Sequence, residues 1–580
     1  MRYLALACDY DRTLATNGQV DATTITALER LLASGRRLLL VTGRELEDLV
    51  AIFPRLDLFD WVIAENGALL YRPSTREEKL LADTPPPEFI ATLHERNVPL
   101  SVGRVIVATF EPHETTVLEV IRDLGLELQV IFNKGAVMVL PSGVNKATGL
   151  AAALEELKLS AHNVVGVGDA ENDHAFLQLC ECSAAVANAL PAVMDRADFV
   201  TRADHSAGVC ELIDEILKDD LRSLAGKLVR HHLHVGSRPS GEEVRIPPYG
   251  INLLVAGSSG GGKSTLARGL LERFSEGDYQ FCVIDPEGDY EDPDNALTLG
   301  DSHDAPSVDE VLQVLDDPGR NVAVNLVGLP LEERPRFFSA LISRLQDLRA
   351  RTGRPHWIML DEAHHVLSAG WEPAEITLAQ GFTSMVFITV HPKSVAFAVL
   401  KSVDLVIALG KDSAEMLDEF AECVAEGPPA SDSLETSSGQ ALLWQRYTGD
   451  APFCFLPEES RGEQRRHRRK YAEGDLGERS FYFRGAQGEL NLRAQNLIVF
   501  SQVAEGVDDA TWVYHLRNGD YSRWFREVLK NQALAAEVAR IEQSEKLSPA
   551  GESRARIKGI IEQHYTLPSS AGASGSDNRI

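Results

Sequence analysis

The sequence predicts an α/β fold in which two domains of sheet and helix follow one another and a small, mainly helical module comes after them. Two observations support this prediction. Short apolar runs of strand length alternate with helical stretches over residues 1–217 and again over 249–457, which is the pattern of parallel sheets covered by helices. The chain of 580 residues is also too long for one hydrophobic core, so several domains are expected.

The first α/β region carries an insertion. Its strands are expected at residues 3–8, 37–41, 61–64 and 164–167. Between residues 84 and 142 the order changes to helix, strand, helix and a strand pair, with a turn at Asn133, Lys134 and Gly135. This change predicts a small α+β cap inserted into the sheet domain.

The rest of the chain divides by composition. A charged, histidine-rich linker is expected over 218–248. The strands of the second α/β region are expected at 252–256, 281–284, 322–326, 357–360, 385–389, 405–408 and 441–445. After it we expect a basic connector at 458–475, a helical module at 476–547 and a disordered tail at 548–580, where serine, glycine and alanine recur.

Composition excludes some classes of protein. No apolar run reaches the ~18 residues that a membrane span needs, and the start lacks a secretory signal, so we expect a cytoplasmic protein without a membrane partner. The net charge of −29 repels nucleic-acid backbones, except at the local basic run 461–470. The seven cysteines are scattered, as reduced thiols would be.

Two carboxylates follow the first predicted strand. Asp9 and Asp11 come at the carboxyl end of the run 3–8, where ligands bind in open α/β sheets. Because alternate residues of an extended chain share a face, both side chains are expected to point at one ligand. Clustered carboxylates are costly unless a cation neutralises them, and Mg²⁺ prefers oxygen ligands, so a metal site is expected here.

Four motifs in this order resemble the haloacid dehalogenase superfamily. They are Asp9 with Asp11 and Thr13, then Thr42 after the strand at 37–41, then Lys146, and finally Asp169 with Asp173 after the strand at 164–167. The resemblance covers residues 1–217 and implies a Rossmann-like core. A cap between the second and third motifs, placed at about 84–142, is similar to the C2 type and to subclass IIB, which holds phosphoglycolate and sugar-phosphate phosphatases.

The resemblance implies a Mg²⁺-dependent phosphatase that hydrolyses a small phosphate ester. Asp9 would attack phosphorus and carry an aspartyl-phosphate, while Asp11 would protonate the leaving oxygen and then activate water. Thr42 and Lys146 would hold the phosphoryl oxygens. The expected Mg²⁺ ligands are Asp9, Asp11, Asp169 and Asp173. One departure is Arg12, because the family commonly has glycine at this position.

The second α/β region begins with a phosphate-binding loop. The strand at 252–256 leads into a glycine-rich segment and then a helix, which is the context of a Walker A loop. Glycines allow backbone N–H groups to converge on phosphate, while Lys263 adds positive charge and Ser264 a Mg²⁺ ligand. The residues expected to bind ATP are Gly257, Gly260, Gly261, Gly262, Lys263, Ser264 and Thr265.

An acidic pair follows the strand at 357–360. Asp361 fits the Walker B position towards Mg²⁺, and Glu362 is placed to polarise the attacking water, so ATP hydrolysis is expected. With the segment 285–290, these motifs resemble the HerA/FtsK-type ATPases over residues 250–450, with His391 where that family keeps a polar sensor. Members often form rings that move DNA, which leaves a homo-oligomer and a nucleic-acid contact open.

Two other functions fit the same residues. A polynucleotide kinase-phosphatase also joins a haloacid dehalogenase phosphatase to a P-loop domain, and Asp285 could then activate a nucleic-acid hydroxyl. The Walker B strand before Asp361 and Glu362, together with the acidic net charge, favours an ATPase over such a kinase. A third interpretation is a regulatory module in which nucleotide binding and the C-terminal helices recruit partners.

Overall fold

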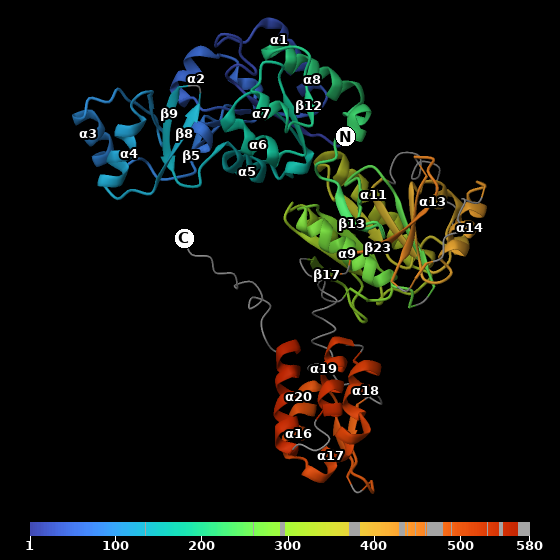
Figure 1. The fold of residues 1–580 in the computed structure, drawn as a ribbon. Helices are drawn as coiled ribbons and strands as arrows, with labels where there is room; N and C mark the ends of the chain where they lie inside the picture. Colours follow the sequence, from blue (N-terminus) through green and yellow to red (C-terminus); the bar gives the residue numbers. More distant parts are fainter. Residues whose placement is uncertain are drawn as a thin grey trace. The chain divides into compact units, whose positions relative to one another are not determined.

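The structure is a computed structural model of the chain, and it divides into two compact units, Met1–Glu458 and Glu459–Ile580 (Figure 1). It describes residues 1–133, 135–258, 260–290, 296–370, 383–427, 436–437, 439–446, 448–458, 460, 480–488, 490–529, 532–544 and 549–565. The basic run 461–470 lies outside these residues.

The first α/β region of unit 1 is built on an 8-stranded sheet in the order β12-β11-β10-β1-β2-β3-β4-β5. Its strands are β1 Ala5–Asp9, β2 Arg37–Val41, β3 Trp61–Ala64, β4 Leu69–Arg72, β5 Glu77–Leu80, β10 Val164–Gly168, β11 Cys182–Ala185 and β12 Phe199–Val200. The helices are α1 Ala22–Ala33, α2 Leu46–Ile52, α5 Lys146–Leu157, α6 His174–Leu179, α7 Pro191–Met194 and α8 His205–Asp219. From β12 to β3 all pairs are parallel, so the predicted fold class is confirmed.

Burial explains the composition of these strands. Every residue of β1, β3, β10 and β11 is buried, because helices cover both faces of the sheet. The edge strand β5 is exposed along its length and reads Glu-Glu-Lys-Leu. Charged side chains on an edge discourage pairing with another chain, which explains why this strand is not apolar.

The cap has its own sheet and hydrophobic core. Its elements are α3 Pro87–Glu95, β6 Ser101–Val102, β7 Val107–Phe110, α4 Glu114–Asp123, β8 Leu128–Asn133 and β9 Ala136–Pro141, with strand order β6-β7-β9-β8. Figure 1 shows α3 and α4 together at one end of the region, beside β8 and β9. The buried carboxylate of Glu65 accepts hydrogen bonds from three successive backbone N–H groups at 104–106 (2.9, 2.7 and 3.0 Å). This contact joins the cap to the core sheet.

The second α/β region of unit 1 carries an 11-stranded sheet in the order β14-β13-β23-β22-β21-β15-β20-β19-β16-β18-β17. Its strands are β13 Leu233–Ser237, β14 Glu243–Ile246, β15 Leu253–Gly257, β16 Phe281–Asp285, β17 Ala296–Leu299, β18 Asn321–Asn325, β19 Trp357–Leu360, β20 Met385–Thr389, β21 Leu405–Leu409, β22 Ala441–Gln445 and β23 Phe453–Pro457. The helices include α9 Lys263–Glu276, α10 Val308–Leu315, α11 Arg334–Thr352, α13 Phe397–Lys401 and α14 Ser413–Cys423. The seven strands from β21 to β17 are parallel.

The segment 218–248 is more than the linker that its charged composition suggests. It contains β13 and β14, which pair with each other and, through β13, with β23. Leu233, Val235, Val244 and Ile246 are buried at alternate positions, the period of a strand with one covered face. The polar residues between them hide this short alternation in the sequence.

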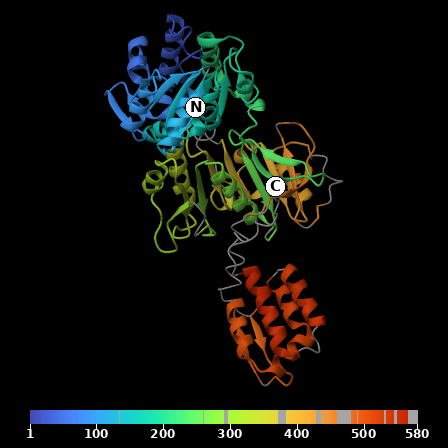
Figure 2. The ribbon, with the colours of Figure 1, turned by 60° about the vertical axis from the view of Figure 1, so that its left-hand side comes forward.

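Unit 2 is a small domain with one hydrophobic core that is rich in aromatic residues. It contains β24 Phe481–Phe483, β25 Leu492–Ala494, α16 Leu497–Gly506, α17 Asp509–Asn518, α18 Asp520–Glu527, α19 Gln532–Ser544 and α20 Ala550–Tyr565. Figure 2 shows its helices side by side. The disordered tail expected at 548–580 overlaps α20, which packs Ile557 and Ile561 into the core and whose Ser553 accepts a hydrogen bond from Trp512 (2.9 Å); residues 566–580 lie outside the described residues.

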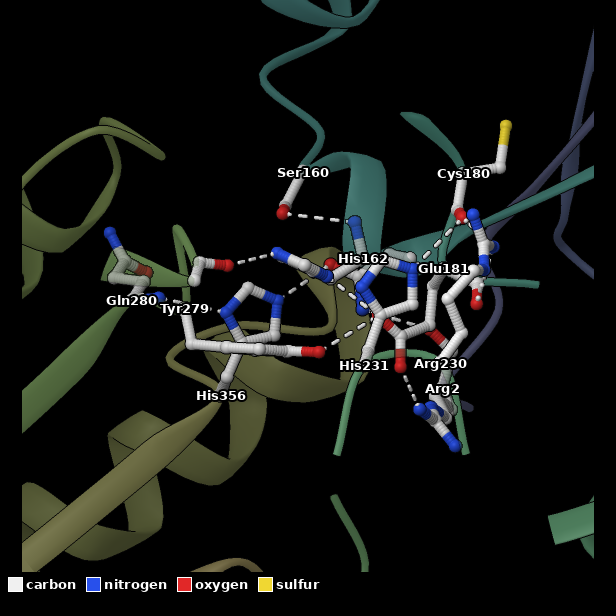
Figure 3. Close-up of polar contacts among 12 residues, drawn as sticks. Arg2, Ser160, His162, Cys180, Glu181, Arg230, His231, Tyr279, Gln280 and His356 are labelled. Carbon is white, nitrogen blue, oxygen red and sulfur yellow. Dashed lines mark hydrogen bonds and ion pairs between the residues drawn. The ribbon is translucent and has the colours of Figure 1, made fainter. Parts of the chain in front are cut away.

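Within unit 1, the two sheets meet at the amino ends of their strands (Figure 3). Glu181, which precedes β11, accepts a hydrogen bond from the hydroxyl of Tyr279 (3.0 Å), which lies shortly before β16. His162, shortly before β10, stacks on the Tyr279 ring at 3.8 Å between centroids and lies 2.6 Å from the carbonyl oxygen of Gly277. His356, which precedes β19, lies 3.3 Å from the side-chain oxygen of Asn163. The contact between the two α/β regions therefore joins residues that precede strands in both sheets.

Among the helices that the structure describes, none is long and apolar enough to span a membrane.

Candidate functional site

A buried acidic cluster lies at the carboxyl edge of the first sheet. Asp9 ends β1, and Asp169 and Asp173 follow the neighbouring strand β10. All three are buried, and one carboxylate oxygen of each lies within 4.8 Å of the others. Parallel pairing of β1 with β10 places both strand ends at one edge, which is why residues 160 positions apart in the chain meet here.

Lys146 holds this cluster together. Its Nζ donates hydrogen bonds to Asp9 Oδ1 and Asp173 Oδ1, both at 2.6 Å. The other oxygen of Asp173 accepts hydrogen bonds from the backbone N–H groups of Asp169 (2.8 Å) and Ala170 (2.9 Å). Lys146 therefore binds the carboxylates of Asp9 and Asp173. Asp173 in turn fixes the backbone of the loop that carries Asp169.

Burial and neighbouring charge perturb these groups. Burial raises the pKa of Asp9 well above its usual value, the charge of Asp173 adds to this rise, and Lys146 opposes it. Burial by itself would lower the pKa of Lys146, but the charges of Asp173 and Asp9 outweigh burial and raise it. The lysine is therefore a permanent cation in an anionic pocket.

Local packing sets the position of Lys146. Asn145 caps α5 by accepting hydrogen bonds from the backbone N–H groups of Ala147 and Thr148, so the helix begins at the lysine. The preceding segment presses against Gly67, where an added Cβ would lie 1.9 Å from the carbonyl oxygen of Asn145. Gly67 also has a φ of +103°, a conformation that glycine adopts freely. The close approach leaves α5 little room to shift.

Asp11 does not join the acidic cluster, in contrast to its expected place among the metal ligands. Its carboxylate is paired with Arg44, whose Nε and one terminal nitrogen donate to the two oxygens at 2.8 Å each. Arg44 also contacts Asp48 on α2. The side chain of Asp11 is 43% exposed, so it lies at the rim of the site. Sequence reasoning missed Arg44, although it follows directly after Thr42 and Gly43.

Thr42 and Thr13 are both buried. Thr42 follows β2, donates its backbone N–H to the carbonyl of Ile63 (2.8 Å), and its hydroxyl oxygen accepts from the backbone N–H of Arg44 (3.1 Å). The Thr13 hydroxyl is buried with no hydrogen-bond partner among the described residues. Arg12, which lies between Asp11 and Thr13 in the chain, has a φ of +64°. Its Nε lies 3.8 Å from Asp169 Oδ2.

The glycine-rich loop that the sequence predicts to bind phosphate lies at the carboxyl end of β15. Gly257 ends the strand, and Gly260 (φ +76°) and Gly262 (φ +99°) take left-handed conformations before α9 begins at Lys263. The N–H of Gly261 donates to the carbonyl of Ser258 (3.0 Å), which curls the loop. Ser264 and Thr265 lie in the first turn of α9, as expected for residues that follow a Walker A lysine.

Asp361 and Glu362 follow β19, and one strand, β20, separates β19 from β15. Burial raises the pKa of Asp361 to about 7, and the nearby charges of Glu362 and Asp285 add to it. Burial also raises the pKa of Glu362, while the charge of Lys263 opposes the rise. Glu362 has a φ of +37°, which is uncommon for a residue with a side chain. Strained conformations of this kind often occur at functional sites.

His364 lies between Glu362 and the end of β20. The Nδ1 of His364 lies 3.4 Å from Glu362 Oε2 and 3.4 Å from the hydroxyl of Thr389, the last residue of β20. The same Thr389 hydroxyl donates a hydrogen bond to the carbonyl oxygen of His391 (3.2 Å). Sequence reasoning left His364 without a role, and its spacing two residues after Glu362 was the available signal.

Asp285 serves the turn that follows β16. Its carboxylate accepts hydrogen bonds from the backbone N–H groups of Glu287 (3.1 Å), Gly288 (2.8 Å) and Tyr290 (2.8 Å). These three donors occupy its oxygens and close the turn. Burial raises the pKa of Asp285, and these hydrogen bonds lower it.

Comparison with known proteins finds similarity in both α/β regions. Residues 6–105 and 128–213 match the family model for haloacid dehalogenase-like hydrolases. A phosphoglycolate phosphatase of Methanothermobacter thermautotrophicus is 31% identical over 218 residues, 36% of this chain and 96% of that protein. Phosphoglycolate phosphatase 2 of Saccharolobus solfataricus is 29% identical over 219 residues, 37% of this chain and 92% of that protein.

The chain therefore belongs to the haloacid dehalogenase-like hydrolase family through its N-terminal region. Its second α/β region is similar to another class of protein: residues 252–335 match the family model for the central domain of the helicase HerA. The matched segment begins just before the Walker A loop and reaches the first turn of α11. The two matched regions lie in one compact unit.

Proposed function

We propose that the N-terminal region is a Mg²⁺-dependent phosphomonoester hydrolase that forms a phosphoryl intermediate on Asp9. The observation that carries this proposal is the buried set of Asp9, Asp169 and Asp173 around Lys146. Buried carboxylates at the carboxyl edge of a parallel sheet suit a phosphate ester only if cations offset their charge. Lys146 supplies one such cation.

Mg²⁺ fits the same residues. The carboxylate oxygens of Asp9, Asp169 and Asp173 lie close enough to share one ion, and oxygen ligands are the ones that Mg²⁺ prefers. When bound, the ion would neutralise negative charge on the transferring phosphoryl group. Asp11 would take no part as a side-chain ligand, because Arg44 holds its carboxylate at the rim.

The side chains divide the chemistry between them. Asp9 attacks phosphorus, so that a bond from its carboxylate oxygen forms as the bond to the leaving oxygen breaks. Asp11, which must leave its pair with Arg44 for this step, gives the leaving oxygen a proton and then takes a proton from the water that hydrolyses the aspartyl-phosphate. Lys146 and Thr42 hold the phosphoryl oxygens throughout. We propose a small phosphate ester as substrate, because relatives named as phosphoglycolate phosphatases match over nearly their full length.

The test is a single-atom change at the nucleophile. Asp9→Asn keeps the size of the side chain and removes its nucleophilic oxygen, so hydrolysis of p-nitrophenyl phosphate with Mg²⁺ should fall at least ~10³-fold, the loss that follows removal of a covalent catalyst. Asp57→Asn changes an exposed carboxylate far from the cluster and should leave the rate as in wild type. Equal rates for wild type and Asp9→Asn would rule out this nucleophile.

We infer a second activity, ATP hydrolysis, for residues 249–457. Support comes from the left-handed glycines before Lys263 and from Asp361 and Glu362 at the end of β19. Glu362, whose Oε2 lies 3.4 Å from His364 Nδ1 and has no hydrogen-bond partner among the described residues, would be placed to orient water. The occupied carboxylate of Asp285 argues against its use as the hydroxyl-activating base of a polynucleotide kinase.

Two variants separate binding from turnover. Lys263→Ala should lose affinity for ATP, whereas Glu362→Gln should bind ATP with near wild-type affinity and hydrolyse it at least ~10²-fold more slowly. Binding is measured by calorimetry and hydrolysis by phosphate release. With γ-labelled ATP and 5′-hydroxyl oligonucleotides, the label should appear only in inorganic phosphate. Labelled oligonucleotides that vanish in Asp285→Asn would favour the kinase instead.

A further inference from the structure

Arg12 occupies a position in the first motif where a side chain is costly. It stands between Asp11 and Thr13 with a φ of +64°, the left-handed region in which Cβ crowds the backbone. Glycine adopts this conformation freely, and the resembling family commonly uses glycine there. Strained residues that persist beside catalytic groups suggest a function for the side chain.

The main chain around Arg12 is firmly held. Its carbonyl oxygen accepts hydrogen bonds from Asn188 Nδ2 (2.9 Å) and from His205 Nδ1 (2.8 Å). Its N–H donates to the carbonyl of Ala15 (3.1 Å). Asn188 in turn accepts from the backbone N–H of His205 at the start of α8. These contacts fix the direction in which the side chain leaves the loop.

The guanidinium group itself is left largely without partners. Among the described residues it makes one ion pair, from Nε to Asp169 Oδ2 at 3.8 Å, and no hydrogen bond. The Arg12 side chain is 50% exposed, although it borders a buried acidic cluster. Arg44 differs in that its guanidinium donates to both Asp11 and Asp48. Arg12 therefore keeps its fork of N–H donors for a ligand.

The position of Arg12 indicates which part of a ligand it meets. Lys146 and Thr42 are buried and stand at the floor of the site, where the transferring phosphoryl group would bind. Arg12 stands at the rim beside Asp169. We propose that Arg12 binds a second anionic group of the phosphatase substrate, a carboxylate or another phosphate, and so selects doubly anionic phosphate esters. This inference rests on the proposed phosphatase function.

The test compares substrates that differ only in the second charge. One pair is 2-phosphoglycolate and 2-hydroxyethyl phosphate, which tests a carboxylate; the other is glucose 1,6-bisphosphate and glucose 6-phosphate, which tests a phosphate. Wild type should prefer the doubly anionic member of at least one pair. Arg12→Gln keeps a side chain at the same φ and removes the charge, so this preference in kcat/KM should fall by about tenfold to a hundredfold, chiefly through KM.

Three further variants make the result specific. Arg12→Lys keeps the charge but not the fork and should retain part of the preference. Arg12→Gly relieves the backbone strain and should lose the preference as Arg12→Gln does, without a lower melting temperature. Arg76→Gln is the matched control, because Arg76 is an exposed arginine with a φ of +58° in the turn between β4 and β5, and it should behave as wild type.

Each other outcome is decisive. An unchanged preference in Arg12→Gln, or equal losses on both members of a pair, would overturn the inference; equal losses would place Arg12 on the transferring phosphoryl group. If wild type hydrolyses none of these esters or p-nitrophenyl phosphate, the proposed phosphatase function itself fails.

Discussion

Glu181→Gln should destabilise the N-terminal region strongly, although Glu181 lies outside both sites. The carboxylate is 3% exposed and is surrounded by donors from three directions. It pairs with Arg2, lies 2.6 Å from His162 Nδ1 and accepts the hydroxyl of Tyr279 at 3.0 Å (Figure 3). Replacing the carboxylate by an amide removes the counter-ion of Arg2 and keeps the size of the side chain.

The magnitude follows from burial. Arg2 is 14% exposed in its side chain, so water cannot replace the lost charge. Removing one partner of a buried ion pair costs about 3–5 kcal/mol. For a region of this size, 1 kcal/mol corresponds to roughly 2–4 °C, so the melting transition should fall by about 6–20 °C. By contrast, Glu29→Gln breaks an exposed pair with Arg55 and should cost at most about 1 kcal/mol.

The effect should also have a defined pH dependence. Burial alone would raise the pKa of Glu181, but the hydrogen bond from His162 and the charge of Arg2 outweigh it, and the pKa falls below its usual 4.5. A carboxyl group whose pKa is lower in the folded state stabilises the fold above the unfolded pKa, and loses this effect only as the pH falls through the folded pKa. The difference between wild type and Glu181→Gln should therefore be equal at pH 7 and pH 5.

The assay is differential scanning calorimetry of both glutamine variants and wild type at pH 7 and pH 5, with circular dichroism to check folding. A change of less than about 1 kcal/mol for Glu181→Gln would refute the reasoning, because it would mean that the ion pair is not effectively buried. A large difference at pH 7 that disappears at pH 5 would refute the assigned direction of the pKa shift.

Two further predictions concern the sites. Gly67→Ala should lower the free energy of unfolding by about 2–4 kcal/mol and impair the phosphatase, because the added Cβ would lie 1.9 Å from the Asn145 carbonyl oxygen and push α5 with Lys146. The measurement is thermal unfolding. The control is Gly18→Ala, which should change stability much less, because Gly18 has a φ of +79° but open space around it. Because burial raises the pKa of Asp361 to about 7, Mg²⁺-ATP should bind Glu362→Gln more weakly at pH 6 than at pH 8, by up to about tenfold per pH unit. Calorimetry should show this dependence shrink when Asp361→Asn is added, and an affinity that is constant over this range would contradict it.

Local sequence was enough to predict the parallel sheets and the places of most acidic residues. Asp9, Asp169 and Asp361 each follow an apolar run that is fully buried as a strand, so strand ends could be located without any long-range information. The neighbouring order of these strands then brings Asp9 and Asp169 together. Their mutual approach is a property of the fold class that the alternating pattern indicates.

Features that depend on distant partners could not be read from the chain. Nothing local in Asp11 indicates that Arg44 will hold it, because both residues lie in loops after different strands. The strand β13 pairs with β23, more than two hundred residues later, and its short alternation is hidden by charged neighbours. The helix α20 has few apolar positions, and its burial depends on the helices that precede it.

The contact between the two sheets has a consequence for the two sites. Its residues precede strands, whereas the acidic residues of both sites stand at or just after the carboxyl ends of strands, so neither site lies at this contact. The residues that join the two regions can therefore be changed without altering a side chain of either site.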